Sequence, residues 1–175
     1  VCVWLGGVLG RGCVQEEIRF VVSPECLCSL LFTPRMGHYE AVLISGVEQF
    51  AEYTGYASSF RFAGRSFAAG SAAKPAVSPR ARVIAIDAIN FARRSSPGEQ
   101  YHRKWLLREL NKAFVGFSAI DAEYDRYAAG QWLRAGLYAS VPTVVSTGNW
   151  GCGVFGGDPQ LKVLLQWAAA TAASV

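Results

Sequence analysis

Near the start of the chain, apolar residues recur at helical spacing directly after a glycine-rich segment. One helix face would carry four aliphatic residues: Val14, Ile18, Val21 and Val22. This pattern predicts a helix that begins at about Cys13. Ser23 followed by Pro24 is typical of the N-cap and first position of another, short helix. The core-facing residues expected in that short helix are Leu27, Leu30 and Leu31.

Short runs of consecutive apolar residues predict buried strands. The clearest run lies in 82–89, where residues 83–86 are apolar without interruption, as expected for a strand that is covered on both faces. Shorter strands are expected at 41–45, 60–62 and 143–146. Residues 69–80 are rich in Gly, Ala, Ser and Pro and are expected to form an irregular loop.

Helical spacing returns in the second half of the chain. A helix over about 99–114 would separate an apolar face from a charged one: Leu106, Leu110, Ala113 and Phe114 against Arg103, Arg108, Glu109 and Lys112. Another helix is expected over 121–138. Asp158 and Pro159 should cap a last helix that runs to about residue 173. The large aromatics expected in the core are Trp105, Trp132 and Trp167.

The interleaving of strands and helices predicts the α/β class, with a mostly parallel sheet flanked by helices. The composition, 51% hydrophobic and 17% charged, is typical of one globular domain. No strand follows the last helix, although a crossover helix normally leads to another strand. The chain also starts with Val1 in what reads as a functional loop, so the domain is expected to be incomplete at both ends.

The net charge bears on the kind of partner, and the cysteines bear on the cellular compartment. The net charge of +4 suits a polyanionic partner, but Lys and Arg are scattered, so no direct readout of nucleic acid is expected. The five cysteines are Cys2, Cys13, Cys26, Cys28 and Cys152. They form no C-x-x-C pair, which argues against a zinc site and a disulfide framework and favours a reducing compartment. No run reaches the roughly 18 apolar residues of a membrane span. We therefore expect a soluble protein of the nucleus or cytoplasm.

Two glycine-rich loops each lead into a helix, an arrangement that presents backbone N–H groups to an anion. The simpler interpretation, that the glycines only mark turns, remains open for either loop alone. Residues 151–156 also satisfy G-x-G-x-x-G. That dinucleotide fingerprint requires a βαβ unit and an acidic residue about 20 positions further on, and the chain ends before either. A nicotinamide cofactor is therefore not expected.

Gln15, Glu16 and Glu17 stand in the first turn of the first predicted helix, where carboxylates are ordinary helix-start residues. Glu17 would lie beside the apolar face and Glu16 nearly opposite it. Because apolar surroundings disfavour the charged form of a carboxyl, we expect Glu17 to have the higher pKa and to act as general acid. Glu16 would then orient substrate hydroxyls or polarise the site.

Leu5-Gly6-Gly7 and, after seven further residues, Gln15-Glu16-Glu17 resemble the glycine run and Q-E-E signature of poly(ADP-ribose) glycohydrolases. Residues 16–20 extend this resemblance, and further segments resemble the family in the same order: 45–49, 53–57, 85–88, 108–113, 147–153 and 157–158. These segments span most of the chain. The fold implied is a single macrodomain-like α/β domain over 1–175.

The resemblance implies an enzyme that hydrolyses the ribose–ribose bonds of poly(ADP-ribose) without a metal or other cofactor. Glu17 matches the acid/base residue and Glu16 the neighbouring active-site carboxylate. Tyr56 would stack on adenine, and residues 149–155 would surround the diphosphate. The full set implied in substrate binding is Gly6, Gly7, Gln15, Tyr56, Asn149, Trp150, Gly151, Cys152, Gly153, Val154 and Phe155. Poly(ADP-ribosyl)ated proteins are the implied partners, and reversal of ADP-ribosylation in the DNA damage response the implied process.

The chain also departs from the family pattern. Leu5 replaces the first glycine of the run, the acid expected just upstream is missing, and 118–140 resembles an insertion. These departures leave two alternatives open. One is an ADP-ribose-binding remnant without catalysis, and the other is a fragment that does not fold alone.

Overall fold

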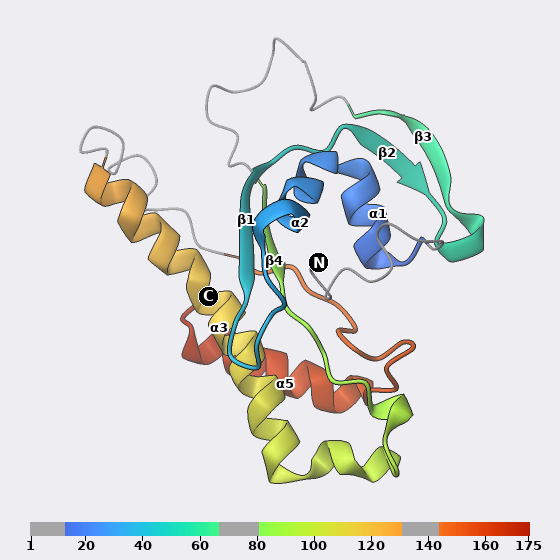
Figure 1. Cartoon of the computed structure of the whole chain (residues 1–175), viewed down its shortest axis with the longest axis vertical. Coiled ribbons are helices and arrows are strands. Elements are labelled where there is room, and N and C mark those ends of the chain that lie inside the picture. Colours follow the sequence, from blue (N-terminus) through green and yellow to red (C-terminus); the bar gives the residue numbers. More distant parts are fainter. Residues whose placement is uncertain (1–12, 67–80, 131–143) are drawn as a thin grey trace. The chain divides into compact units, whose positions relative to one another are not determined.

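The computed structural model describes residues 13–66, 81–130 and 144–175, and Figure 1 traces the chain in sequence colours. The chain forms two compact units. The first unit comprises Val1–Met36 and Ile44–Val83, and the second comprises Gly37–Leu43 and Ile84–Val175. The loop predicted at 69–80 lies outside the described residues.

Helical elements lie at both ends of the described chain, and the strands lie between them. The helical elements are α1 (Gln15–Val22), η2 (Pro24–Cys28), α2 (Ser29–Phe32), η3 (Ala57–Ser59), η4 (Phe91–Arg93), η5 (Pro97–Tyr101), α3 (Arg103–Gly130) and α5 (Pro159–Ala172), where η marks a 3₁₀ helix. The strands are β1 (Val42–Val47), β2 (Ala51–Thr54), β3 (Arg61–Arg65) and β4 (Ala81–Ala85). β1 pairs with β4 and β2 pairs with β3, each in a two-stranded sheet.

The first unit has a small apolar core. Its buried residues are Phe20, Cys26 and Val47, and Leu30, Ile44 and Val83 pack against them. Helix α1 begins close to the predicted position, but its buried face differs from the predicted one. Val21 is 55% exposed, whereas Phe20 is buried, because burying the larger ring removes more apolar surface from water.

The short helix predicted after Ser23 is confirmed as η2, which begins at Pro24 and continues into α2. The expectation that Leu27 and Leu31 point into the core is wrong, since Leu31 is 86% exposed and Leu27 is also exposed. A 3₁₀ helix has three residues per turn, so its apolar positions do not align as they would in one continuous α-helix.

β2 and β3 form an antiparallel hairpin in which Ala51 lies opposite Arg65 and Thr54 opposite Arg61. The apolar pattern indicates β3 only through 60–62 and misses β2, because β2 is half-buried and lacks an apolar run. The rings of Tyr53 and Phe60 pack with their centroids 5.7 Å apart.

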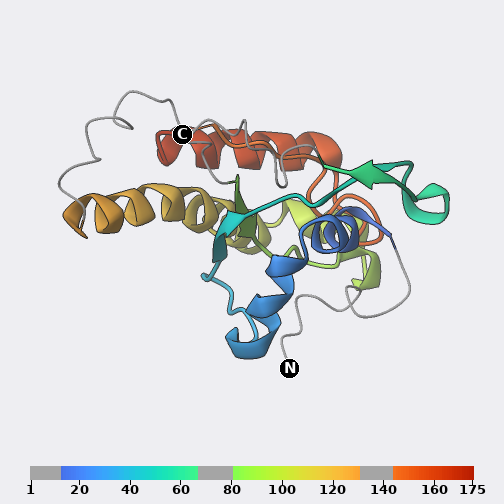
Figure 2. The same ribbon diagram turned by 90° about the horizontal axis from the view of Figure 1, so that it is seen from above.

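In the second unit, α5 packs against α3, as Figures 1 and 2 show. The buried residues of this core are Ala113, Phe117, Ala169 and Ala173, joined by partly buried side chains such as Ile84 and Ile86. A Cβ at Gly116 would lie 2.9 Å from both of these isoleucines, so α3 needs a glycine to approach them. Two separate helices were predicted over 99–114 and 121–138, but α3 continues without interruption to Gly130. Residues 131–138 lie outside the described residues.

The charged face predicted for α3 is wrong. Arg108, Glu109 and Lys112 are 7%, 2% and 0% exposed, whereas Phe114 of the predicted apolar face is 38% exposed. Burial of a charge is tolerated where a partner replaces the lost water. These three side chains have such partners within the second unit.

Three further expectations for the second unit need correction. Residues 144–149 have no regular structure, so the described part of the strand predicted at 143–146 is absent, and β4 ends at Ala85 instead of 89. Trp167 is 69% exposed instead of belonging to the core. Trp105 is half-buried, and Trp132 lies outside the described residues. Within the described ranges, no helix has the length and apolar composition needed to cross a membrane.

Candidate functional site

The predicted carboxylates stand at the start of α1 in the first unit. Val14 occupies the N-cap position in extended conformation, and its N–H donates to Oε2 of Glu17 at 3.0 Å. Glu17 is the third residue of the helix, the position from which a glutamate commonly caps the helix start. Its side chain is 8% exposed, so this hydrogen bond holds a buried carboxylate in a defined place.

Glu16 is half-buried, and burial together with the nearby charge of Glu17 raises the pKa of its carboxyl from 4.5 to about 7. Its Oε1 atom is shielded from solvent and has no hydrogen-bond partner among the residues described. The sequence argument placed a raised pKa at Glu17, and the structure places one at Glu16. Gln15, the first helical residue, is exposed.

Tyr56 lies on a tight turn that is attached to the start of α1. Gly55 has φ +75°, and a Cβ there would lie 2.0 Å from the carbonyl oxygen of Ser59, so only glycine fits. The N–H of Tyr56 donates to Ser59 Oγ at 2.9 Å, and the N–H of Ala57 donates to the carbonyl oxygen of Cys13 at 2.8 Å. The first unit therefore brings the 52% exposed Tyr56 ring and the glutamates of α1 to neighbouring segments.

The second glycine-rich loop belongs to the second unit and folds through consecutive turns. Gly151 and Gly156 have φ +75° and +66°. The N–H of Gly157 donates to the carbonyl oxygen of Gly151 at 2.9 Å, which closes the loop on itself. Asp158 then caps α5, as predicted, by accepting the N–H of Leu161 at 2.7 Å. The loop thus leads directly into a helix start.

The side chains of this loop differ in exposure. Asn149 and Val154 are exposed, whereas Trp150 and Cys152 are half-buried. Burial and the nearby Asp158 raise the pKa of the Cys152 thiol, so its reactive thiolate is disfavoured. Cys152 therefore contributes to the loop as a packed side chain.

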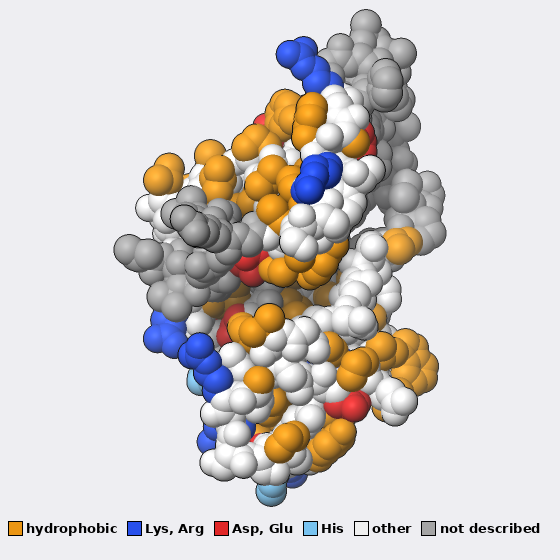
Figure 3. Space-filling model, turned by 90° about the vertical axis from the view of Figure 1, so that its right-hand side faces the viewer, with side chains coloured by type: hydrophobic (Ala, Val, Ile, Leu, Met, Phe, Trp, Pro, Cys, Tyr) orange, Lys and Arg blue, Asp and Glu red, His pale blue; other side chains and the backbone are white. Residues whose placement is uncertain are grey.

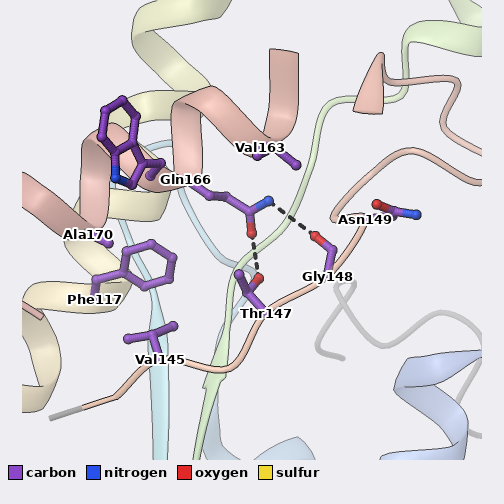
Figure 4. A pocket seen from close by; sticks show the side chains of 9 residues that line it. Phe117, Val145, Thr147, Gly148, Asn149, Val163, Gln166 and Ala170 are labelled. Atoms are coloured by element: carbon purple, nitrogen blue, oxygen red, sulfur yellow. Dashed lines mark hydrogen bonds between the residues drawn. The ribbon is translucent and has the colours of Figure 1, made fainter. Parts of the chain in front are cut away.

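A hollow of about 270 Å³ lies where the loop meets α5 (Figure 4). Its lining residues are Phe117, Val145, Thr147, Gly148, Asn149, Val163, Gln166, Trp167 and Ala170. The amide of Gln166 accepts a hydrogen bond from Thr147 and donates to the carbonyl oxygen of Gly148 at 3.1 Å. Gln166 therefore holds the first residues of the loop against α5.

A buried ionic cluster lies behind the loop, and sequence reasoning missed it. The ammonium of Lys162 lies 3.9 Å from the ring centroid of Trp150 and forms an ion pair with Glu109. Arg108 pairs with both Glu109 and Asp87, and Lys112 pairs with Asp87 at 2.8 Å. In the sequence, only the resemblance of 85–88 and 108–113 to family segments could have pointed to these charged residues.

The charges in this cluster perturb one another. Burial is the main cause that lowers the pKa of Lys162 to about 7, with the Arg108 charge acting in the same direction. Burial likewise lowers the pKa of Lys112, although Asp87 opposes that shift. Lys112 also donates to the carbonyl oxygens of Gly37 and Glu40, which fastens α3 to the segment before β1.

The predicted site residues thus fall into three groups. Gln15, Glu16, Glu17 and Tyr56 are brought together in the first unit, and residues 149–155 form one loop in the second. Gly6 and Gly7 lie outside the described residues. The catalytic and binding roles assigned to these residues stay predictions. Among residues 13–66, 81–130 and 144–175, no three His, Cys, Asp or Glu side chains are grouped to hold a metal ion.

Comparison with known proteins identifies the family. Residues 3–175 match the family model described as "Poly (ADP-ribose) glycohydrolase (PARG), Macro domain fold". This match confirms the predicted α/β, macrodomain-like fold class and the resemblance drawn from the motifs.

Curated relatives agree with the family match. The chain is 38% identical to "Poly(ADP-ribose) glycohydrolase 1" of Arabidopsis thaliana, over 95% of the chain and 38% of the relative. It is 39% identical to "Probable poly(ADP-ribose) glycohydrolase 2" of the same plant, over 95% of the chain and 35% of the relative. It is 34% identical to "Poly(ADP-ribose) glycohydrolase 1" of Caenorhabditis elegans, over 94% of the chain and 20% of the relative. The chain therefore spans less than two fifths of the length of these relatives.

Proposed function

The chain belongs to the poly(ADP-ribose) glycohydrolase family, and on that premise we propose that it hydrolyses the ribose–ribose O-glycosidic bonds of poly(ADP-ribose) and releases ADP-ribose. The observation that carries this proposal is that the family match includes Gln15-Glu16-Glu17, which starts helix α1. The relatives' names state the same activity for those proteins.

In the proposed mechanism, Glu17 gives its proton to the ribose oxygen that leaves when the glycosidic C–O bond breaks. The bonding electron pair goes to that oxygen, and water then attacks the anomeric carbon while the Glu17 carboxylate takes up the water's proton. The sum of the two steps is addition of one water across the bond. The hydrogen bond from the Val14 N–H to Oε2 supports this role, because it fixes the position of the carboxyl.

Glu16 would act on substrate hydroxyls beside the reacting bond. With a pKa of about 7, its carboxyl keeps its proton through mildly acidic pH and can donate a hydrogen bond there. Its buried Oε1, which has no partner among the described residues, is an acceptor that a substrate hydroxyl could satisfy. Both properties suit a group that orients the ribose.

Each unit of the chain contributes candidate residues for recognition of ADP-ribose. Tyr56 exposes a flat ring that suits stacking on adenine, and Gln15 would contact the ribose. Residues 149–155 would surround the diphosphate with backbone N–H groups near the start of α5. Gly6 and Gly7 would allow a close approach of the backbone to the ligand.

We further propose that the protein acts on poly(ADP-ribosyl)ated proteins in the nucleus or cytoplasm, as part of the response to DNA damage. The free state of the described cysteines, Cys13, Cys26, Cys28 and Cys152, supports a reducing compartment.

Release of ADP-ribose from purified poly(ADP-ribose) tests the activity, with Glu17→Gln measured beside the parent. Glutamine retains an oxygen that accepts the Val14 N–H but cannot donate a carboxyl proton, so the fold should survive and turnover should stop. Glu52→Gln, at an exposed glutamate of the same unit, is the matched control and should keep full activity.

The outcomes separate the alternatives. Release by the parent and the control but not by Glu17→Gln supports the hydrolase. Binding of ADP-ribose without release favours the non-catalytic remnant, and equal loss of binding and hydrolysis in Glu17→Gln would exclude Glu17 as the proton donor.

A further inference from the structure

A basic surface lies on the segment between β4 and α3 and on the first residues of α3. It consists of Arg93, Arg94, His102, Arg103 and Lys104, all of them exposed. Glu99 is the one acidic residue between 93 and 104, and it lies 3.7 Å from Arg94. Within the part of the chain that the structure describes, Arg93, Arg103 and Lys104 form no ion pair. Figure 3 shows Lys and Arg side chains gathered at the lower left of its view.

The positions of these positive charges are unfavourable for the folded chain itself. Arg103 and Lys104 are the first two residues of the long helix α3, whose first turn contains no acid. The helix dipole disfavours cations at that end. Arg94 and Lys104 also approach one indole, that of Trp105, with distances of 4.1 Å and 4.6 Å to the ring centroid. Like charges held this closely repel each other unless an anion lies between or beside them.

The basic surface is attached to the loop that would hold the diphosphate. The carbonyl oxygen of Phe155 accepts the N–H groups of Phe91 and Ala92 at 2.8 Å and 3.0 Å. The buried Gln100 accepts the N–H of Asp158, at the end of the loop, at 2.7 Å. Hydrogen bonds on both sides of the loop therefore fix the basic segment beside it.

We propose that this basic surface binds the diphosphates of poly(ADP-ribose) units adjacent to the unit held in the site. The inference rests on the proposed function and adds to it a subsite for the polymer. Each repeat of the polymer carries a diphosphate, so a chain that enters or leaves the 149–155 loop presents anions at regular intervals. Exposed guanidinium groups bind such anions through paired N–H donors.

The test compares two double variants in the Glu17→Gln background, which limits degradation of the polymer. Arg93→Gln/Arg103→Gln removes two charges from the basic surface and spares Arg94 and Lys104, which pack on Trp105. Arg35→Gln/Arg65→Gln removes two charges from exposed arginines of the first unit and is the matched control. Dissociation constants are measured for ADP-ribose, for poly(ADP-ribose) of defined length and for single-stranded DNA of equal charge, over a range of salt concentrations.

We expect the basic-surface variant to bind the polymer about tenfold more weakly at low salt, with unchanged affinity for ADP-ribose. The slope of log K against log salt should become shallower by about 1.4, since each lost contact with a single strand removes about 0.7. The control should match the parent in both respects.

Three outcomes would overturn the subsite: unchanged affinity for the polymer, an equal loss of affinity for ADP-ribose, or DNA bound as tightly as the polymer and lost to the same extent. Failure of the proposed function is a separate result. If the Glu17→Gln protein binds the polymer through this surface but the unsubstituted chain releases no ADP-ribose, the subsite is supported and the hydrolase is contradicted.

Discussion

Lys162 stacks its ammonium group against the indole of Trp150, 3.9 Å from the ring centroid, and so links helix α5 to the loop 149–155. Trp150 in turn donates its Nε1–H to the carbonyl oxygen of Ile86 at 3.2 Å, just beyond β4. The loop is therefore attached through one aromatic side chain to two other parts of the second unit. Loss of the ion pair between Lys162 and Glu109 should therefore disturb the conformation of the loop.

The first prediction concerns the ion pair between Glu109 and Lys162. Glu109→Gln removes the carboxylate that pairs with the buried Lys162 and Arg108, and breaking a buried pair typically costs about 3–5 kcal/mol. We expect the free energy of unfolding in urea to fall by an amount of this order. The partly exposed pair of Arg94 and Glu99 is the control, because Glu99→Gln should change stability by less than about 1 kcal/mol. Similar losses in both variants would contradict a special role of the cluster.

The second prediction follows from the raised pKa of Glu16. Its carboxyl keeps its proton to about pH 7 in the folded protein but titrates near 4.5 when unfolded. Between these values the folded state binds more protons, so this group's contribution to stability declines as pH rises from about 4.5 to 7. Glu16→Gln, which stays neutral, should therefore be more stable than the parent at pH 8 and equal to it below pH 4.5.

Urea midpoints at a series of pH values check the behaviour of Glu16→Gln, with the exposed Glu52→Gln as control. Removal of the carboxyl should raise the free energy of unfolding at alkaline pH. A variant that is less stable than the parent at pH 8 would show that the ionised Glu16 has a partner in the folded state.

The third prediction concerns the backbone beneath Tyr56. Gly55→Ala places a Cβ 2.0 Å from the Ser59 carbonyl oxygen and forces φ +75° on a residue that rarely adopts it. We expect the turn to rearrange, stability to fall by about 1–3 kcal/mol and ADP-ribose affinity to drop. Gly98→Ala is the control, because its Cβ would meet only Ser96 Oγ at an ordinary 3.5 Å. Isothermal titration with ADP-ribose and thermal unfolding measure the two effects.

The fourth prediction separates the ring of Tyr56 from its hydroxyl. Base–aromatic stacking contributes about 1–3 kcal/mol per base, so Tyr56→Ala should weaken ADP-ribose binding by roughly tenfold or more. Tyr56→Phe keeps the flat ring and should bind nearly as the parent does. Because Tyr56 is exposed, neither change should alter the unfolding midpoint strongly. An unchanged dissociation constant in Tyr56→Ala would remove the stacking role.

Local signals in the sequence predicted local structure well. The Ser23-Pro24 and Asp158-Pro159 pairs mark the starts of η2 and α5, and Asp158 makes the capping bond expected of it. Ser23 makes no such capping bond, and at η2 the fixed φ of Pro24 suits the first helical position. Such signals succeed because a helix start depends on residues a few positions apart. The strand β2 was missed because it lacks an apolar run. It forms by pairing with β3, and its own four residues do not indicate that pairing.

The sequence by itself determined the family and the α/β class, because the ordered motifs from Gly6 to Asp158 are a property of the chain alone. Only the tertiary structure decided which charges are buried. Arg108, Glu109 and Lys112 follow a pattern typical of a solvated helix face, yet they lie in the interior. Their partners Asp87 and Lys162 are 21 and 53 residues away from Arg108 and Glu109, respectively. A charge leaves water only where a partner is positioned to replace it, and that position exists only once the chain has folded.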